Sequence, residues 1–351
     1  MLTIGILFCD RDLNYLQELL NSIPHKVKIP YELILLDNRT DTSSDISFLD
    51  SYTVLNKGQG NIYQLAGRKK IIENAIGDFI WFVDSDDTFF EIDESFNDIL
   101  NSNFDFISFS FLIKSKDGEF WNEIKDKVIE GNLLLPEANN TPCCLWNKWI
   151  RTSVLKQVIE FIPDTARVSA SEDLIYVLGA LKFGSSQLQN SKYIYTFNSE
   201  NSCSGLNDYS EQLEKFKRCI FGLNEANDII RKFLSESELK QLEINLEKND
   251  CQFFLKKVLL TDDLNTKTKM FEIIKNQFSG NVIKETWNNF LDCQEMTVSQ
   301  YQQMDELLTS EFGDEIGIVK NTTLFIWDDG TEETRTEKEK ILPLCLQNNV
   351  D

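Results

Sequence analysis

The sequence predicts an α/β fold followed by a mainly helical region, and two observations support this prediction. Up to about residue 205, apolar runs typical of buried strands alternate with segments of helical period, which is the pattern of a mostly parallel sheet with helices on both faces. After residue 207, long stretches keep the helical period with few strand signals. The 351 residues are enough for two domains, and we place them at 1–205 and 206–351.

The first part of the chain alternates strands and helices in a regular order. A helix is expected between Leu13 and Pro24, since leucines recur at helical spacing and proline ends the pattern. A second helix is expected over residues 62–76. The strands predicted in this part are Leu2–Cys9, Tyr31–Leu36, Tyr52–Leu55 and Phe79–Val83.

Later elements are predicted from the same periodicities. Residues 144–160 have a helical pattern around Trp146 and Trp149, and Glu172–Phe183 is a further helix. The remaining strands are expected at Asp105–Ile113 and Tyr193–Phe197. The helical region is expected to contain 208–234, 236–260, 263–278 and 296–312.

Carboxylates follow three of the predicted strands. They come directly after the apolar runs, and in parallel sheets ligands bind beyond the carboxyl ends of the strands. We therefore expect these groups to converge on one edge of the sheet. The three sets are Asp10/Asp12, Asp37/Asp41 and Asp84/Asp86/Asp87.

The net charge and the cysteine content argue against a nucleic-acid partner and against a zinc site. The formal net charge is -22, which disfavours a nucleic-acid partner unless a local basic groove overrides it. Eight cysteines without a CxxC pair and a single histidine, His25, argue against a zinc site and favour a reducing cytoplasm. No signal peptide or membrane span is apparent. A cytoplasmic enzyme, with peripheral membrane association left open, is the expectation.

The segment Asp84-Ser85-Asp86-Asp87 is the strongest chemical signal. Carboxylates at alternate positions in a turn can point at one cation, and oxygen ligands suit Mn²⁺ or Mg²⁺. Such a cation neutralises a diphosphate leaving group. An acidic turn that caps the next helix is the competing interpretation. The buried strand before the turn favours the metal site, with Asp84 and Asp86 as ligands.

Several ordered motifs resemble glycosyltransferase family 2, whose members have the GT-A fold, a Rossmann-like mixed sheet. Gly77–Asp87 resembles the signature of that family around its Asp-x-Asp motif, and Ala75 supplies the leading alanine. Tyr31–Asp41 is similar to the second strand and its acidic turn, and Tyr193–Ser202 to the closing stretch. The resemblance covers about residues 1–205.

The resemblance implies roles for residues on the donor side. Asp37 matches the carboxylate that contacts the nucleotide base, typically uracil, while Arg68 matches an arginine expected at the diphosphate. Lys69 or Lys70 can assist Arg68. Asp10 is a further nucleotide-contact candidate, although the turn that contains it departs from the usual motif of the family.

On the acceptor side, Ser171–Leu174 resembles the "G-E-D" motif, which makes Asp173 the general base and Glu172 a positioning group. Acids at a helix start can also be simple caps. Trp146-Asn147-Lys148 is similar to a segment near the acceptor. Either tryptophan, Trp146 or Trp149, can stack on a sugar or pack in the core.

The resemblance thus implies an inverting glycosyltransferase that moves a sugar from a nucleotide-sugar, typically a UDP-sugar, to a hydroxyl in a glycan or cell-surface polymer. Hydroxylated DNA bases are an alternative acceptor. A nucleotidyltransferase and a catalytically inactive nucleotide-sugar-binding module are further alternatives; the first lacks its glycine-rich loop here. The helical domain is expected to bind acceptor or to form a homo-oligomer.

Overall fold

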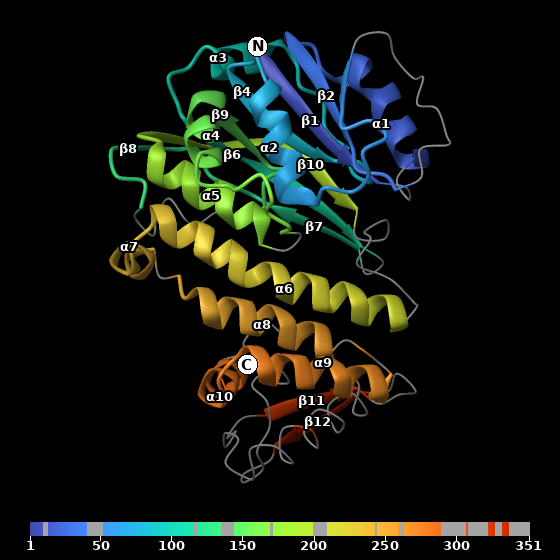
Figure 1. The fold of residues 1–351 in the computed structure, drawn as a ribbon. Helices are drawn as coiled ribbons and strands as arrows, with labels where there is room; N and C mark the ends of the chain where they lie inside the picture. Colours follow the sequence, from blue (N-terminus) through green and yellow to red (C-terminus); the bar gives the residue numbers. More distant parts are fainter. Residues whose placement is uncertain are drawn as a thin grey trace. The chain divides into compact units, whose positions relative to one another are not determined.

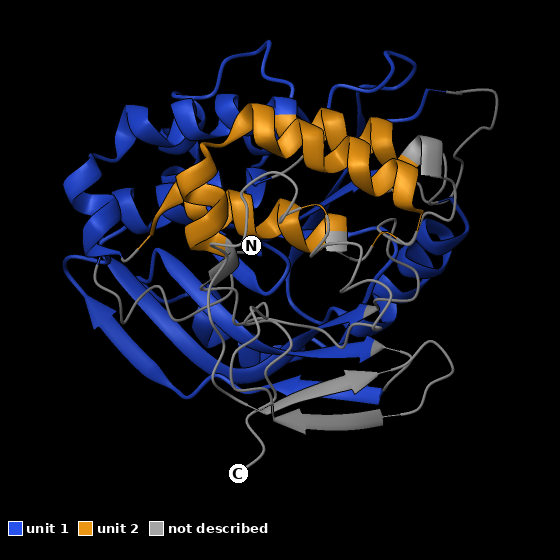
Figure 2. Ribbon diagram, turned by 90° about the horizontal axis from the view of Figure 1, so that it is seen from below, with its two compact units in different colours: residues 1–205, 221–243 blue, residues 206–220, 244–351 orange. Residues whose placement is uncertain are grey.

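The computed structural model describes residues 1–9, 13–40, 52–115, 118–134, 144–168, 171–198, 209–242, 244–259, 261, 263–288, 307, 322–326 and 332–336. Within these residues the chain forms two compact units, coloured in Figure 2. The first contains residues 1–205 and 221–243. The second contains residues 206–220 and 244–351.

The first unit is built on a mixed sheet, visible in Figure 1. In the described residues the strand order is β3-β2-β1-β4-β9-β6-β10-β5, with β7 beside β6 and β8 beside β10. The strands are β1 (Leu2–Phe8), β2 (Tyr31–Asp37), β3 (Thr53–Leu55), β4 (Phe79–Asp84), β5 (Thr88–Phe89), β6 (Phe106–Ser115), β7 (Gly118–Asn122), β8 (Lys127–Glu130), β9 (Lys148–Arg151) and β10 (Ser186–Asn198).

Helices cover both faces of this sheet. On one face α1 (Leu13–Lys26) and α3 (Asn97–Leu100) bury their apolar side chains in a core with β1 and β4. On the other face lie α2 (Gln64–Asn74), α4 (Thr152–Ile159) and α5 (Glu172–Phe183). A short 3-10 helix, η1 (Glu94–Phe96), precedes α3. The prediction of a mixed α/β domain followed by helices is confirmed.

Strands β1 and β4 are buried on both faces, as their continuous apolar runs predict. They pair in parallel, and β1 also pairs in parallel with β2. In this register Phe8 lies beside Asp37, and Leu7 lies beside Asp84. The carboxyl ends of β2 and β4 therefore flank the end of β1 at one edge of the sheet.

One predicted helix is partly wrong. Residues 144–160 were expected to be helical throughout, but Lys148–Arg151 form β9, which pairs antiparallel with β4 and β6, and the helix α4 begins only at Thr152. Trp149 is fully buried there, between Phe96 and Phe109. The sheet completes its hydrogen bonds through this strand, which overrides the helical period of the sequence.

The remaining elements are mainly helical. Helix α6 (Tyr209–Phe233) runs from the second unit into the first, which also contains α7 (Glu236–Gln241) with a capping box between Ser235 and Glu238. The second unit contains α8 (Leu246–Leu259), α9 (Leu264–Gln277), α10 (Gly280–Asn288) and the antiparallel pair β11 (Thr322–Ile326) and β12 (Glu332–Thr336). Phe216 packs edge-on against Phe254 in its core, with ring centroids 5.1 Å apart.

Candidate active site

Arg68 is the centre of the candidate active site. It lies on α2, and only 8% of its side chain is exposed. Its Nη1 donates hydrogen bonds to Glu172 Oε1 at 2.7 Å and to Asp173 Oδ1 at 2.6 Å. Its Nη2 lies 3.5 Å from Asp84 Oδ1. We call these four residues the Arg68 cluster; it joins the end of β4 to the start of α5.

Tight packing of α2 brings Arg68 to this position. A Cβ on Gly67 would lie 2.4 Å from Leu7 Cδ1 and 2.8 Å from Leu36 Cδ2, so a larger residue would force these leucine side chains to move or the helix to lie farther from β1 and β2. The helix start is also constrained, since Tyr63 has a φ of 66°. The neighbour Arg68 therefore reaches across the sheet edge, with its guanidinium 5.7 Å from the Phe82 ring centroid.

Helix α5 presents the two acids from its first turn. Ser171, just before it, has a left-handed backbone with φ 61°, which is costly for a residue other than glycine and is kept only where the surroundings enforce it. Asp173 also accepts a hydrogen bond from the Leu145 N–H to Oδ2 at 3.1 Å. Both oxygens of Asp173 are thereby oriented, and a quarter of its side chain remains exposed, 25%.

The charges of the Arg68 cluster do not balance, because three carboxylates surround one guanidinium. Partial burial at the end of β4, together with the nearby charges of Asp173, Asp86 and Glu172, raises the pKa of Asp84 to about 7 against the opposing effect of Arg68. Burial likewise raises the pKa of Glu172, which Arg68 counteracts. Despite its own burial, Arg68 has a raised pKa because of the surrounding carboxylates.

This excess of negative charge fits a divalent cation. Asp84 is the open member of the cluster, with 40% of its side chain exposed, and Asp86 is half-buried. Within the described residues no group of three or more His, Cys, Asp or Glu side chains could hold a metal ion by itself. A metal at Asp84 and Asp86 would therefore need oxygen ligands from a bound molecule, as Mg²⁺ does with substrate phosphates.

The turn after β4 is fixed by an aromatic side chain. Tyr195, fully buried on β10, donates from its hydroxyl to Asp87 Oδ2 at 2.7 Å and accepts from the Asp84 N–H at 3.2 Å. Trp146 stacks on the Tyr195 ring, with centroids 4.7 Å apart. Tyr195 was not predicted to support the acidic turn, because the contact joins residues more than 100 positions apart in the sequence.

Asn147 and Lys148, which were predicted on the acceptor side, lie in the interior. They are 0% and 1% exposed. Lys148 Nζ donates to the Cys144 carbonyl at 2.6 Å and to Asn147 Oδ1 at 2.7 Å, while Asn147 Nδ2 donates to the Phe109 carbonyl. Their polar groups hold the segment before β9, and Trp146 is only half-buried.

Asp37, the predicted base contact, is bound within the chain. It is 1% exposed and forms a bidentate ion pair with Arg39, at 2.9 Å for each of the two hydrogen bonds from Nε and Nη2. Arg39 was missed by the sequence analysis. Asp10, another predicted contact, lies outside the described residues.

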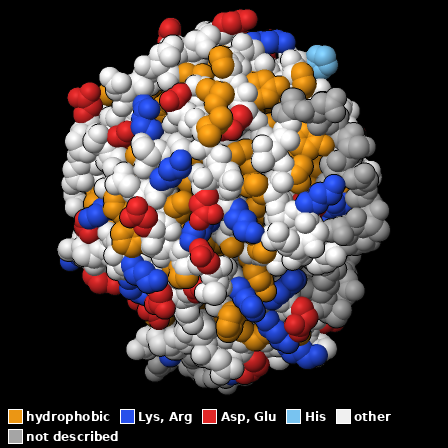
Figure 3. Space-filling model, turned by 45° about the horizontal axis from the view of Figure 1, so that its top comes forward, with side chains coloured by type: hydrophobic (Ala, Val, Ile, Leu, Met, Phe, Trp, Pro, Cys, Tyr) orange, Lys and Arg blue, Asp and Glu red, His pale blue; other side chains and the backbone are white. Residues whose placement is uncertain are grey.

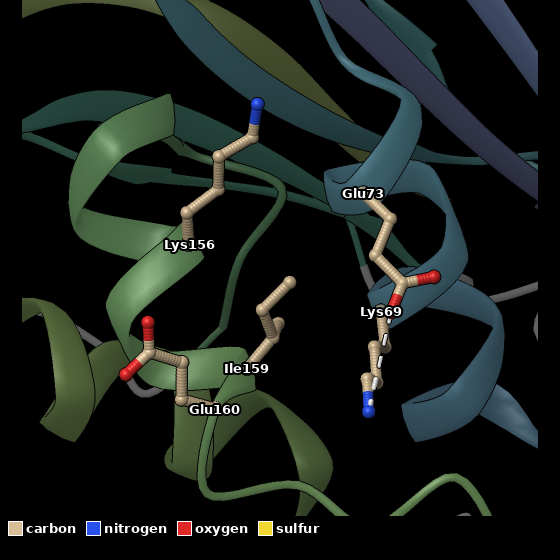
Figure 4. A pocket seen from close by; sticks show the side chains of 5 residues that line it. All are labelled: Lys69, Glu73, Lys156, Ile159 and Glu160. Atoms are coloured by element: carbon tan, nitrogen blue, oxygen red, sulfur yellow. Dashed lines mark ion pairs between the residues drawn. The ribbon is translucent and has the colours of Figure 1, made fainter.

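Lys69 and Lys70 do not reach the Arg68 cluster. Lys69 Nζ donates to the Ile162 carbonyl at 2.7 Å and pairs with Asp164 at 2.5 Å; Lys70 Nζ donates to Asn56 Oδ1 at 3.1 Å. Lys69 lines a pocket of about 430 Å³ between α2 and α4, shown in Figure 4, together with Glu73, Lys156, Ile159 and Glu160. Its two lysines and two glutamates give it no charge excess of either sign.

The fold and the Arg68 cluster define a class of protein: the first unit is a GT-A-like domain with acidic groups at the carboxyl ends of its central strands. Residues 3–158 match the model of glycosyl transferase family 2. Over these residues the match confirms the predicted resemblance to this family, and with it the predicted assignment as a glycosyltransferase rather than a nucleotidyltransferase. No curated protein matches the sequence.

Solved structures of the Staphylococcus aureus protein TarS are similar in outline. TarS 1–349 is 16% identical over 99% of each chain, with a TM-score of 0.46. Its complex with UDP-GlcNAc is 17% identical, covers 97% of this chain and 98% of the other, and has a TM-score of 0.48. At these scores the likeness does not define a substrate. In the described residues, no helix has the length and apolarity needed to cross a membrane.

Proposed function

We propose that this glycosyltransferase moves a sugar from a UDP-sugar to an acceptor hydroxyl with inversion, and that the Arg68 cluster is its reaction centre. The observation that carries the proposal is the connection of Asp84 to Glu172 and Asp173 through one buried guanidinium. A transfer reaction needs a place for the diphosphate and a base for the acceptor within the same small volume.

Asp173 is the proposed general base. An alcohol does not lose its proton at neutral pH, so a carboxylate must take it while the oxygen attacks the anomeric carbon. Asp173 is partly exposed, and its two oxygens are held by Arg68 and the Leu145 N–H. Glu172 is more buried, 12% exposed, and its proposed role is to orient Arg68 rather than to touch the acceptor.

Asp84 and Asp86 are the proposed ligands of Mn²⁺ or Mg²⁺. The bound cation would supply positive charge to the diphosphate as the bond to the sugar breaks. Arg68 also lies next to Asp84, within reach of the same phosphates. Arg68 was expected to bind the phosphates directly, but it already donates hydrogen bonds to Glu172 and Asp173. We therefore propose that it connects the diphosphate site at Asp84 with the general base Asp173.

The acceptor is proposed to be a glycan or cell-surface polymer. The net charge of -22 argues against nucleic acid, and acidic and basic side chains are interspersed over the face shown in Figure 3. Trp146, half-buried over Tyr195, is the proposed acceptor contact. Asn147 and Lys148 would then act through the segment that positions it. Residues 1–205 would form the catalytic domain and residues 206–351 a domain for acceptor binding or oligomerisation.

A donor screen tests the proposal. Release of UDP is measured for a panel of UDP-sugars with and without Mn²⁺, followed by trials with polyol and glycan acceptors. We expect Mn²⁺-dependent release with at least one donor, and more release when an acceptor is added. An enzyme that uses only donors carrying another base, or that releases UDP equally well in excess chelator, contradicts the proposal.

A further inference from the structure

Tyr195 joins the two ends of the acidic turn that follows β4. Its hydroxyl accepts a hydrogen bond from the Asp84 N–H at 3.2 Å and donates one to Asp87 Oδ2 at 2.7 Å. The backbone of the turn is also closed, since the Asp87 N–H donates to the Asp84 carbonyl at 3.3 Å. Both candidate metal ligands, Asp84 and Asp86, therefore belong to a short segment whose first and last residues are tied to one phenol group.

The Tyr195 side chain is held from several directions. The residue is fully buried, and it pairs with Phe89 in β5, the strand that directly follows the turn. Trp146 stacks on its ring with centroids 4.7 Å apart, and Trp81 of β4 meets it edge-on at 6.5 Å. The indole N–H of Trp81 donates to the Trp146 carbonyl at 2.6 Å. Because the ring is packed on these sides, the position of its hydroxyl is fixed.

Asp87 is placed to hold the turn rather than to bind a cation. Only 4% of the residue is exposed, and its Oδ2 accepts the hydrogen bond from Tyr195. Asp84, by contrast, has 40% of its side chain exposed, and Asp86 is half-buried. The three aspartates of the turn thus divide into two that reach solvent and one that is buried.

We propose that Tyr195 is a positioning residue, whose hydroxyl holds the turn in the shape in which Asp84 and Asp86 bind one cation together. The inference rests on the proposed function, in which a divalent cation at these two residues receives the diphosphate. Within the part of the chain that the structure describes, no group of three or more His, Cys, Asp or Glu side chains could hold a metal ion. The shape of the turn therefore decides whether the two carboxylates meet the same cation.

The variant Tyr195→Phe removes the hydroxyl and keeps the ring that stacks on Trp146. The turn then loses the group that bridges its two ends, and Asp84 and Asp86 are held less firmly in one arrangement. Residues that orient metal ligands typically contribute about 10–100-fold to metal affinity. The cation should therefore bind more weakly, while the part of the nucleotide site that does not depend on the cation stays the same.

Calorimetric titration of UDP at a series of Mn²⁺ concentrations tests the inference, and it requires neither the sugar nor the acceptor. The Mn²⁺ concentration at which half of the gain in UDP affinity is reached is called the Mn²⁺ requirement. We expect it to rise about tenfold or more in Tyr195→Phe. UDP affinity in excess chelator should equal that of the wild type. A merely structural role would lower the thermal transition and leave the Mn²⁺ requirement unchanged.

Thr152→Val is the matched control. The Thr152 hydroxyl is also buried and donates to the Gly77 carbonyl at 2.6 Å, two residues before β4 begins. The control therefore removes a buried hydroxyl bond at the opposite end of the same strand. It should keep the Mn²⁺ requirement of the wild type.

A folded Tyr195→Phe, judged by its thermal transition, that keeps the wild-type Mn²⁺ requirement overturns the inference. If this variant fails to fold, Asp87→Asn takes its place, since a neutral amide oxygen accepts the same hydrogen bond more weakly than a carboxylate. Its Mn²⁺ requirement should also rise, and an unchanged value overturns the inference. A wild type whose UDP affinity does not respond to Mn²⁺ overturns the proposed function instead.

Discussion

Two groups of charged residues lie at the same edge of the sheet, and they are built differently. In the Asp37–Arg39 pair one cation meets one carboxylate, and both are closed off from solvent. In the Arg68 cluster one cation meets three carboxylates, and Asp84 and Asp173 remain partly exposed. A balanced, closed pair holds a fixed geometry, whereas an unbalanced, open cluster can receive a cation and a substrate.

The largest effect is expected for Asp173→Asn, which keeps the shape of the side chain but removes the base. Transfer should fall about 10²–10⁴-fold, while binding of UDP in Mn²⁺ stays near the wild-type affinity. Rates are measured as UDP release with acceptor present. Asp164→Asn, at an aspartate with 89% side-chain exposure, is the control and should retain activity. Full transfer by Asp173→Asn would remove Asp173 from the role of base.

Arg68→Met should destabilise the first unit. Glu172 and Asp84 would lose the guanidinium that they share, and leaving the buried charge of Glu172 uncompensated costs about 3–5 kcal/mol. Urea unfolding followed by circular dichroism measures the loss. Arg151→Met serves for comparison, since its pair with Asp105 is 24% and 17% exposed and should matter less. Equal losses in the two variants would mean that the cluster is not specially dependent on Arg68.

Asp86→Asn should weaken the effect of the metal. We expect UDP affinity in Mn²⁺ to fall about 10–100-fold, since loss of one ligand charge leaves the cation held mainly by Asp84 and the phosphates. Affinity in excess chelator should change little. Asp93→Asn, at the exposed cap of η1, is the control. A variant that responds to Mn²⁺ as the wild type does would exclude Asp86 as a ligand.

The smallest effect is expected at a balanced pair near the surface, Lys182 and Glu238. The hydrogen bond from Lys182 lowers the pKa of Glu238 to about 2. A lowered carboxyl pKa stabilises the fold above the unfolded value, and this stability is lost as pH falls from about 4.5 towards 2. Glu238→Gln should therefore cost at most about 1 kcal/mol near pH 7. The difference from wild type in thermal melts should vanish near pH 2; a constant difference would contradict the assignment.

The sequence predicted the parts of the site that depend on local pattern. The apolar run of β4 identified the strand that ends at Asp84, and Glu172-Asp173 were placed at a helix start, where α5 begins. Arg68 was predicted to contact phosphate. Its contacts with Asp84, Glu172 and Asp173 were not predicted, because spacing in the sequence cannot show that these three residues converge on it. The ion pair of Arg39 with Asp37 was not predicted, because an Asp-x-Arg spacing does not indicate that the two side chains are buried together.

The wrong helix prediction at Lys148–Arg151 also results from contacts between residues that are far apart in the sequence. Lys148–Arg151 keep a helical period, but their place between β4 and β6 makes them a strand. That pairing also buries Lys148, which was predicted on the acceptor side, although lysine is rarely buried. Long-range partners decide such positions, and no local pattern encodes them.

The proposed function requires the Arg68 cluster to receive a divalent cation together with a diphosphate. Calorimetric titration of UDP into the wild-type chain, with Mn²⁺ and then with excess chelator, tests it most directly. We expect Mn²⁺ to tighten UDP binding by at least about tenfold, because the cation offsets the excess of carboxylates. Equal affinity in the two conditions would contradict it.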